Sequence, residues 1–462
     1  MSAIKIKGAT IFTMVRGEAP YEGDILIRDS RIASIGPSIA EEAEEILDGR
    51  GMLAMPGLVN AHQHSPMSLL RAFSDDLKLM DWLERKMLPA ENRMTPEDIY
   101  WGAKLGIAEM IKSGTTAFAD MYIHMNEIAE AVKETGIRAS LTRGVIGLED
   151  DGGRRMAEAA DLIDRWHGQA DGRITTMVGP HAPYTCPPHF MKEALALAAD
   201  KGVPVHTHLA ETVEETAKIR EKYNRTPTEY LADTGLLSHG HVLLAHGVHL
   251  TPQDIKLLRG IKGGVAHNPV SNLKLSCGIA PVAELLKQGT TVGLGTDGAG
   301  SATTLDMFEE IKAAAWLQKL RSGNPASFTA GEALAMATAG GAELLGLREE
   351  LGTLEAGKKA DIILIDLRKP HLQPVHHAES LLAYSVGGAD VDTTIVNGRI
   401  LMQGRRLLTM DEEEILRETA VRAQRITAGI KPAKSRPAGG MLASEARVKS
   451  SSLRQGQVKA KE

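Results

Sequence analysis

The middle of the chain alternates between short apolar runs and longer amphipathic stretches. The apolar runs lie at residues 58–61, 115–121, 138–145, 175–179, 203–206, 241–245, 264–266 and 291–295. Between them, apolar residues recur at helical spacing, as at 99–111 and 190–199, and these stretches often end at glycine. Eight strands alternating with helices predict a closed (β/α)8 barrel of the TIM type, with a doubly wound sheet as the alternative.

The two ends of the chain have a β-rich pattern instead. Short apolar or alternating runs, broken by Gly, Asp and Pro, lie at residues 4–7, 25–27, 31–35 and 52–55, and again at 361–366 and 394–401. Asn397-Gly398, between β-prone residues, is a strong hairpin signal. We therefore predict an α/β protein with a barrel at 58–349. Residues 1–57 and 350–430 would together form a small β-sandwich domain, the second part also carrying a C-terminal helix.

Charge and composition narrow the class of protein. The 462 residues include 53 Lys+Arg and 59 Asp+Glu, a net charge of -6. Residues 431–462, rich in Ser, Gly, Ala and Pro, hold eight Lys/Arg against two Asp/Glu, which predicts a disordered basic tail. The chain has only two cysteines, and we find no apolar run long enough for a signal peptide or a membrane helix. We expect a cytoplasmic protein with neither membrane nor nucleic-acid partners, and leave homo-oligomer formation open.

Residues that can bind a metal gather where predicted strands end. The four segments are Asn60-Ala-His62-Gln-His64, His206-Thr-His208-Leu-Ala-Glu211, Ala245-His246-Gly-Val-His249 and Gly293-Leu-Gly-Thr-Asp297. The carboxyl ends of barrel strands share one edge, and residues i and i+2 of a strand face the same side, so His62 and His64 can bind one ion. Imidazole nitrogens with one carboxylate suit a catalytic zinc site.

This pattern resembles the amidohydrolase superfamily over nearly the whole chain. The general signatures are PGLVNAHQH at 56–64 and GTLEAGKKAD at 352–361. More specific segments are DDLKLMDWL at 75–83, GPHAPYTC at 179–186, HLAET at 208–212 and AHNPVSNLKL at 266–275. Together they resemble the methylthioadenosine/S-adenosylhomocysteine deaminases. One departure is Gln63, where that family often has Thr between the first two histidines.

The resemblance implies a metal centre and three catalytic groups. One divalent metal, zinc or alternatively Fe²⁺, would be bound by His62, His64, His208 and Asp297. Glu211, His246 and Asp297 would be catalytic. Metal-activated water would attack the ring, Glu211 would protonate a ring nitrogen, and Asp297 would pass a proton to the departing ammonia. The predicted fourth strand ends in VGPHAP without Lys, which favours a single metal over a two-metal site.

The resemblance also implies groups that bind substrate. These are Trp82, Glu91, Arg143, Arg155, His181 and Glu211. Trp82 would pack near the nucleoside, Glu91 would bind the ribose hydroxyls, and His181 would contact the purine. Arg143 and Arg155 (or the neighbouring Arg154) are candidates for an amino-acid carboxylate, because a guanidinium binds a carboxylate through two parallel hydrogen bonds. A core aromatic at Trp82 and ordinary surface charges at the acid and the arginines are the structural alternatives.

We therefore expect a metal-dependent aminohydrolase. Its reaction would convert an adenosine-type nucleoside, 5′-methylthioadenosine and/or S-adenosylhomocysteine, to the inosine analogue and ammonia. The alternative within the enzymes is a deaminase or chlorohydrolase for another ring, such as guanine, 5′-deoxyadenosine or a triazine. The alternative outside the enzymes is a metal-binding scaffold or a nucleic-acid-associated protein acting through the basic tail.

Overall fold

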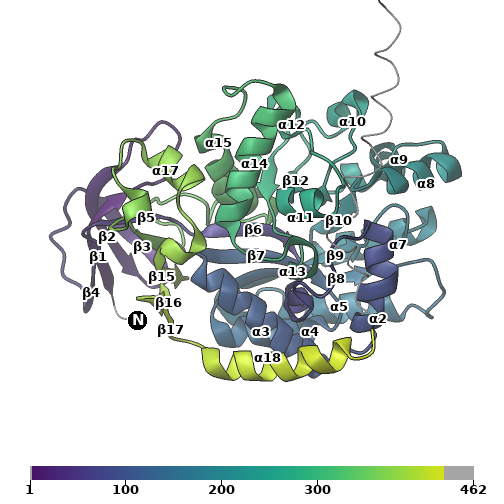
Figure 1. The fold of residues 1–462 in the computed structure, drawn as a ribbon, viewed down its shortest axis with the longest axis horizontal. Helices are drawn as coiled ribbons and strands as arrows, with labels where there is room; N and C mark the ends of the chain where they lie inside the picture. The colour runs from purple at the N-terminus through teal and green to yellow at the C-terminus, as the bar shows by residue number, and fades with distance from the viewer. Residues whose placement is uncertain (1–2, 431–462) are drawn as a thin grey trace, which may run out of the picture.

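A parallel barrel is the central element of the computed structural model, which describes residues 3–430 (Figure 1). Its strands are β6 (Leu58–Gln63), β7 (Thr115–Tyr122), β8 (Arg138–Val145), β9 (Ile174–Pro180), β10 (Val205–Leu209), β11 (Val242–His246), β12 (Gly263–His267) and β13 (Val292–Leu294). Each strand pairs in parallel with the next along the chain. Just past β13 the chain returns to β6, where the N–H of Asp297 donates to the carbonyl of His62 at 2.9 Å. The barrel prediction is confirmed, and the doubly wound alternative is wrong because consecutive strands are neighbours throughout.

Helices pack around the barrel and at the carboxyl ends of its strands. The longer ones are α3 (Pro96–Lys112), α4 (Met125–Thr135), α5 (Arg154–Trp166), α7 (Pro188–Lys201), α8 (Val213–Tyr223) and α14 (Met307–Ser322). The shorter ones are α1 (Leu79–Trp82), α2 (Leu88–Glu91), α6 (Gln169–Gly172), α9 (Pro227–Asp233), α10 (Pro252–Leu257), α11 (Pro269–Lys274), α12 (Val282–Lys287), α13 (Ala299–Ala302), α15 (Ala330–Ala335), α16 (Gly341–Leu344) and α17 (Ala378–Tyr384). The start of α3 shows how local sequence sets a boundary: Thr95 and Asp98 form a reciprocal capping box, and Pro96 occupies the first turn.

The second sheet is built from both chain ends. Its strands are β1 (Ile4–Ile11), β2 (Tyr21–Arg28), β3 (Arg31–Gly36), β4 (Glu45–Asp48), β5 (Met52–Pro56), β14 (Ile362–Asp366), β15 (Val391–Val396), β16 (Arg399–Gln403) and β17 (Arg406–Leu407). Antiparallel pairing of β5 with β14 joins the two ends. The sheet folds back on itself, so that its edge strand β3 lies beside the segment before β14. There the N–H of Ile32 donates to the carbonyl of Lys358 at 2.9 Å. Asn397 and Gly398 have φ values of 51° and 76°, as the predicted hairpin requires.

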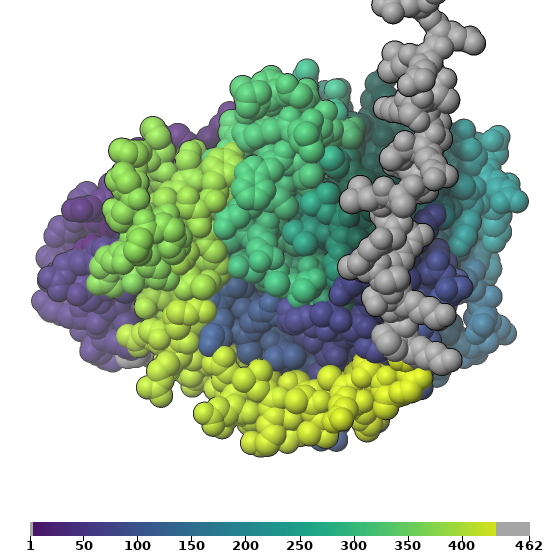
Figure 2. All heavy atoms as spheres, viewed as in Figure 1, coloured from purple at the N-terminus to yellow at the C-terminus, as the bar shows by residue number. Residues whose placement is uncertain are grey.

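Ion pairs to buried carboxylates join the small domain and the last helix to the barrel. Arg138, at the start of β8, donates two hydrogen bonds of 3.0 Å to the carboxylate of Asp361, just before β14. Helix α18 (Glu412–Thr427) is the yellow segment along one side of the molecule in Figure 2. It packs against α3, and its Arg422 and Arg425 bind Asp98. Within residues 3–430 no helix is both long and apolar enough to span a membrane. The predicted tail at 431–462 lies outside the described residues.

Candidate metal and active site

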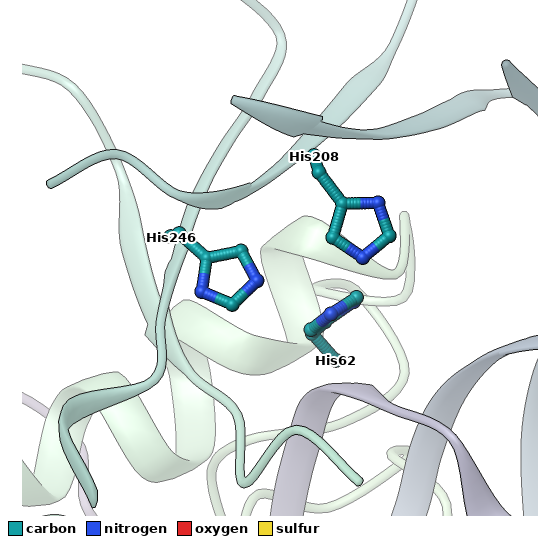
Figure 3. Close-up of side chains that lie close together, drawn as sticks. All are labelled: His62, His208 and His246. Carbon is teal, nitrogen blue, oxygen red and sulfur yellow. The ribbon is translucent and has the colours of Figure 1, made fainter. Parts of the chain in front are cut away.

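The proposed metal ligands meet at the carboxyl edge of the barrel. His62 and His64 lie at the end of β6, His208 lies on β10, His246 is the last residue of β11, and Asp297 follows β13. The ring of His62 is 4.9 Å from the rings of both His64 and His208, and 5.4 Å from that of His246. Figure 3 shows the rings of His62, His208 and His246 turned toward one shared space. Four strands that are distant in sequence thus contribute to one cluster.

The donor atoms of this cluster suit a divalent metal ion. They form two overlapping sets, His62/His64/Asp297 and His62/His208/His246, each with its atoms within 4.8 Å of one another. Asp297 Oδ1 lies 3.2 Å from His64 Nε2 and 3.8 Å from His62 Nε2. His62 Nε2 is buried and has no hydrogen-bond partner among the described residues. A buried nitrogen left free beside a carboxylate fits coordination to zinc. His246 is therefore near enough to be a further ligand besides its predicted catalytic role.

Each of the three predicted ligand histidines is oriented through its other ring nitrogen. His64 Nδ1 donates to the carbonyl of Met121 at 2.6 Å, and His208 Nδ1 donates to the carbonyl of His181 at 2.7 Å. His62 Nδ1 lies 2.9 Å from His206 Nε2. Because a carbonyl only accepts hydrogen bonds, the first two rings must carry their proton on Nδ1 and leave Nε2 for the site.

Protonation in the metal-free cluster centres on one ion pair. Burial lowers the pKa of His62 and of His208 well below the usual range, so both rings are neutral. Burial would also lower the pKa of His64, but the hydrogen bond and charge of Asp297 overcome it and raise this pKa to about 9. In return, the proton on His64 holds the pKa of Asp297 well below its usual range, although burial opposes this. A bound cation would replace that proton.

Two serines orient the Asp297 carboxylate. Ser271 and Ser301 donate to Oδ2 at 2.6 and 2.8 Å, while the N–H of Gly298 donates to Oδ1 at 2.8 Å. Oδ1 is thereby held toward the histidines. The neighbouring Asn272 contacts His246 Nδ1 at 3.0 Å through its side-chain oxygen. Ser271 and Asn272 belong to the AHNPVSNLKL segment, so a sequence signal existed for them, but their partners were not predicted.

Glu211 lies beside the metal cluster in a nearly closed environment. Its carboxylate is 3.9 Å from His246 Nε2 and 4.0 Å from Cys277 Sγ. Burial raises the pKa of Glu211, and the negative charge of Asp297 acts in the same direction against the opposing effect of His246. A carboxyl group with a raised pKa keeps its proton at higher pH, which suits a proton donor.

A second acid, which the sequence did not single out, holds Glu211 in place. The Glu215 carboxylate accepts the N–H groups of Ala210 at 3.0 Å and Glu211 at 2.8 Å. Ala210 needs this support because its φ is 49°, in the left-handed region that disfavours side chains. His246 and Asp297 also have positive φ, 76° and 63°. Three strand ends at this edge thus adopt strained backbone conformations, which are typical of functional sites.

The predicted substrate residues Trp82 and Glu91 come from the segment between β6 and α3. Trp82 is buried, and its Nε1 has no hydrogen-bond partner within residues 3–430. Tyr122, at the end of β7, donates its hydroxyl to the Glu91 carboxylate. The Tyr122 ring also lies 6.2 Å from that of His64, so Tyr122 connects Glu91 to the histidine–aspartate cluster. Tyr122 is a site residue that sequence reasoning missed.

The remaining predicted substrate residues lie at the ends of β8 and β9. The ring of His181 is 4.7 Å from that of His208, and burial lowers the pKa of His181 to about 4, so it is neutral. Arg143 is already paired with Glu158, with its Nε 2.9 Å from the carboxylate. Arg155 donates one hydrogen bond of 3.0 Å to a backbone carbonyl and lies 3.6 Å from Asp151. Arg155 therefore has the more available guanidinium of the two.

A separate groove of about 1200 Å³ lies away from this site, between the small domain and the start of β13. Its lining carries both signs of charge, for example Arg16, Glu332, Lys358 and Glu379. It contains none of the residues predicted for the metal or the substrate. Cavity size alone therefore does not locate the candidate active site of this protein.

Comparison with known proteins agrees with this geometry. The amidohydrolase family matches residues 53–401. A 5-methylthioadenosine/S-adenosylhomocysteine deaminase of Desulforudis audaxviator is 50% identical over 410 residues, 88% of this chain and 95% of the relative. A 5′-deoxyadenosine deaminase of Methanosarcina acetivorans is 45% identical over 93% of this chain and 99% of the relative. The crystal structure of an adenosine deaminase from Xanthomonas campestris with bound zinc has a TM-score of 0.87, with 31% identity over 92% of this chain and 98% of that one. The predicted resemblance is thus confirmed: the chain belongs to the amidohydrolase family, in the group of the 5-methylthioadenosine/S-adenosylhomocysteine deaminases.

Proposed function

We propose that this protein removes ammonia hydrolytically from an adenosine-type nucleoside, 5′-methylthioadenosine and/or S-adenosylhomocysteine, to give the inosine analogue. The observation that carries this proposal is the buried Glu211 beside the histidine–aspartate cluster, because burial raises its pKa and so favours a proton donor there. Adenine must accept a proton at a ring nitrogen before water can add to the neighbouring carbon, and Glu211 supplies that proton. The 5′-deoxyadenosine deaminase among the relatives makes 5′-deoxyadenosine the second candidate substrate.

The metal site proposed here holds one ion, on His62, His64, His208 and Asp297. Zinc, or alternatively Fe²⁺, would make water acidic enough to act as a nucleophile at neutral pH. The free, buried His62 Nε2 and the oriented Asp297 carboxylate support this ligand set. His246 is assigned to catalysis, because its Nε2 faces Glu211 across 3.9 Å.

The protein groups account for every proton of the reaction. Asp297 accepts one proton of the nucleophilic water and passes it to the departing amino group, which leaves as ammonia. Glu211 donates its proton to the ring nitrogen, where it stays in the product. The second proton of the water returns to Glu211 as the ring carbonyl forms. His246 holds the attacking oxygen through Nε2, since Nδ1 is already bonded to Asn272.

Substrate selection would depend on residues around this centre. We assign the ribose hydroxyls to Glu91, since a carboxylate can accept from both and Tyr122 already orients it. Trp82 and His181 would contact the nucleoside. For the amino-acid carboxylate of S-adenosylhomocysteine, Arg155 is favoured over Arg143, which would first have to release Glu158. A small nucleoside is the partner proposed, in a cytoplasmic protein without nucleic-acid or membrane partners.

A substrate panel tests the proposal most directly. Loss of adenine absorbance and release of ammonia would be followed with 5′-methylthioadenosine, S-adenosylhomocysteine, adenosine, 5′-deoxyadenosine, guanine and a chlorotriazine. We expect turnover of at least one adenosine compound. Metal-loaded protein that converts none of them would refute the function. Deleting residues 431–462 should leave turnover unchanged, whereas salt-sensitive DNA or RNA binding that needs these residues, in a protein without turnover, would support the scaffold alternative.

Single variants test the residue roles. His208→Ala should lose the metal, whereas Glu211→Gln should keep the metal and lose about 10²–10⁴ in rate, as expected for loss of a general acid. His376→Ala, at an exposed position, serves as the control and should change neither quantity. Loss of metal in Glu211→Gln, or full metal content in His208→Ala, would show that these roles are wrongly assigned.

A further inference from the structure

His62 is oriented differently from the other two predicted ligand histidines. His64 and His208 each donate Nδ1–H to a backbone carbonyl, but His62 Nδ1 faces the ring nitrogen Nε2 of His206 at 2.9 Å. Both of these rings are fully buried. The hydrogen-bond partner that orients the His62 ring is therefore a side chain, whereas the partner of the other two rings is a backbone carbonyl.

His206 is in turn held by a third residue. Its Nδ1 lies 3.3 Å from the hydroxyl of Thr142. His62, Thr142 and His206 belong to β6, β8 and β10, which are alternate strands of the barrel. Inward-facing side chains from alternate strands form one layer of a barrel interior. These three residues thus form a hydrogen-bonded layer beside the histidine–aspartate cluster.

The direction of the hydrogen bond decides whether His62 can bind a metal. If His62 donates from Nδ1, its Nε2 carries a lone pair that faces Asp297 and the cluster. If His206 donates instead, His62 must carry its proton on Nε2, which then cannot coordinate a cation. Only the first arrangement is compatible with a metal bound by His62, and it also places a proton on His206 Nδ1, where Thr142 can accept it.

We propose that His206 is a positioning residue for the metal site: it accepts the Nδ1–H of His62 and so fixes the tautomer that presents Nε2 to the metal. This inference rests on the proposed function, in which His62 is a ligand. An imidazole suits this place because it is a neutral acceptor. A carboxylate in the same fully buried layer would be a charge without a cationic partner.

Metal affinity of the apoprotein tests this role independently of activity. Zinc dissociation constants would be measured by chelator competition, and the absorption spectrum of the cobalt-loaded protein would report ligand geometry. His206→Leu cannot accept a hydrogen bond and should weaken zinc binding by about 10–100-fold, the usual effect of losing such a partner. His206→Gln can accept through its amide oxygen and should stay within about threefold of the natural protein, with the same cobalt spectrum.

Two controls keep the outcome interpretable. His167 also bonds a threonine hydroxyl through Nδ1, to Thr176 at 2.9 Å, but lies outside the site, so His167→Leu should leave zinc affinity unchanged. His208→Ala should abolish binding. If His208→Ala kept full affinity, the proposed metal site itself would be wrong. If His208→Ala lost the metal but His206→Leu kept natural affinity, the role of His206 would be refuted.

Two further outcomes also decide the matter. Equal weakening by Leu and Gln at position 206 would mean that ring packing matters rather than the hydrogen bond, which overturns the proposal. If His206→Leu does not fold, Thr142→Val replaces it, since it removes the group that fixes the proton on His206 Nδ1. We expect Thr142→Val to weaken zinc binding at least threefold. Unchanged affinity in a folded Thr142→Val protein would overturn the proposal.

Discussion

Glu215 should control catalysis without touching substrate or metal. Its carboxylate accepts the N–H groups of Ala210 and Glu211 at 3.0 and 2.8 Å. Hydrogen bonds to a charged acceptor contribute about 1.5–3 kcal/mol each, whereas a left-handed alanine costs about 1–2 kcal/mol. The two bonds therefore outweigh the strain at Ala210 and hold Glu211 toward the cluster. Because burial raises the pKa of Glu215 to about 7, the carboxylate is ionised in an assay at pH 8.

Glu215→Ala removes both bonds and leaves the strain unopposed. A strain of about 1–2 kcal/mol then leaves the left-handed conformation at Ala210, which holds Glu211 toward the cluster, populated at only about 3–20%. The value of kcat/KM should therefore fall about 5–30-fold. The kcat/KM of Glu215→Gln should lie between those of the natural protein and of Glu215→Ala, because an amide has one acceptor oxygen for two N–H groups. The fall should appear mainly in kcat, since the metal ligands are untouched.

Ammonia release and bound metal would be measured together on each variant. The matched control is Glu214→Ala, which removes an exposed glutamate from the preceding position of α8. It should stay within twofold of the natural protein. The reasoning would be refuted if Glu215→Ala kept its rate, if it lost metal in parallel with rate, or if Glu214→Ala lost as much.

Three other predictions follow from buried groups near the site. Tyr122→Phe removes the donor to Glu91, so KM should rise about tenfold for nucleosides with ribose hydroxyls but not for 2′,3′-dideoxyadenosine; equal changes for both would contradict the assignment. Zinc binding at pH 7 should release about one proton from His64, because its pKa in the metal-free protein is raised to about 9; buffer-dependent binding enthalpies measure this, and no proton release would contradict it. Burial raises the pKa of Asp120 from 3.8 to about 6, so the metal-free protein should lose about 3 kcal/mol of stability from this group as pH rises from about 4 to 6. Asp120→Asn should remove that part of the pH dependence in urea unfolding, and an unchanged slope would contradict it.

The barrel was predictable because its signal is local. Each strand is a short, nearly continuous apolar run, and the structure buries these runs on both faces. The same holds for the hairpin, where Asn397-Gly398 alone determines the turn. The strands that were missed, β4 and β17, are four and two residues long, and little in such short segments distinguishes a strand from a loop.

The identity of the candidate site residues was also readable along the chain, because ligand types recur where strands end. Their partners were not. Tyr122 binds Glu91 across 31 positions, and Ser271 binds Asp297 across 26. Such pairs depend on how strands and loops stack around the barrel, which no local pattern records. For the same reason, the sequence offered Arg143 as a candidate for binding a substrate carboxylate, whereas the fold pairs it with Glu158.

The sequence by itself determined which chemical groups the protein has and that they would share one edge of a barrel. Periodicity and strand-end motifs are properties of residues close together in the chain, so they can be recognised from the sequence alone. Only the tertiary structure decided which nitrogen of each histidine is free, because that depends on the acceptor facing the other nitrogen. It likewise decided the raised pKa of Glu211, since desolvation comes from atoms supplied by the whole fold.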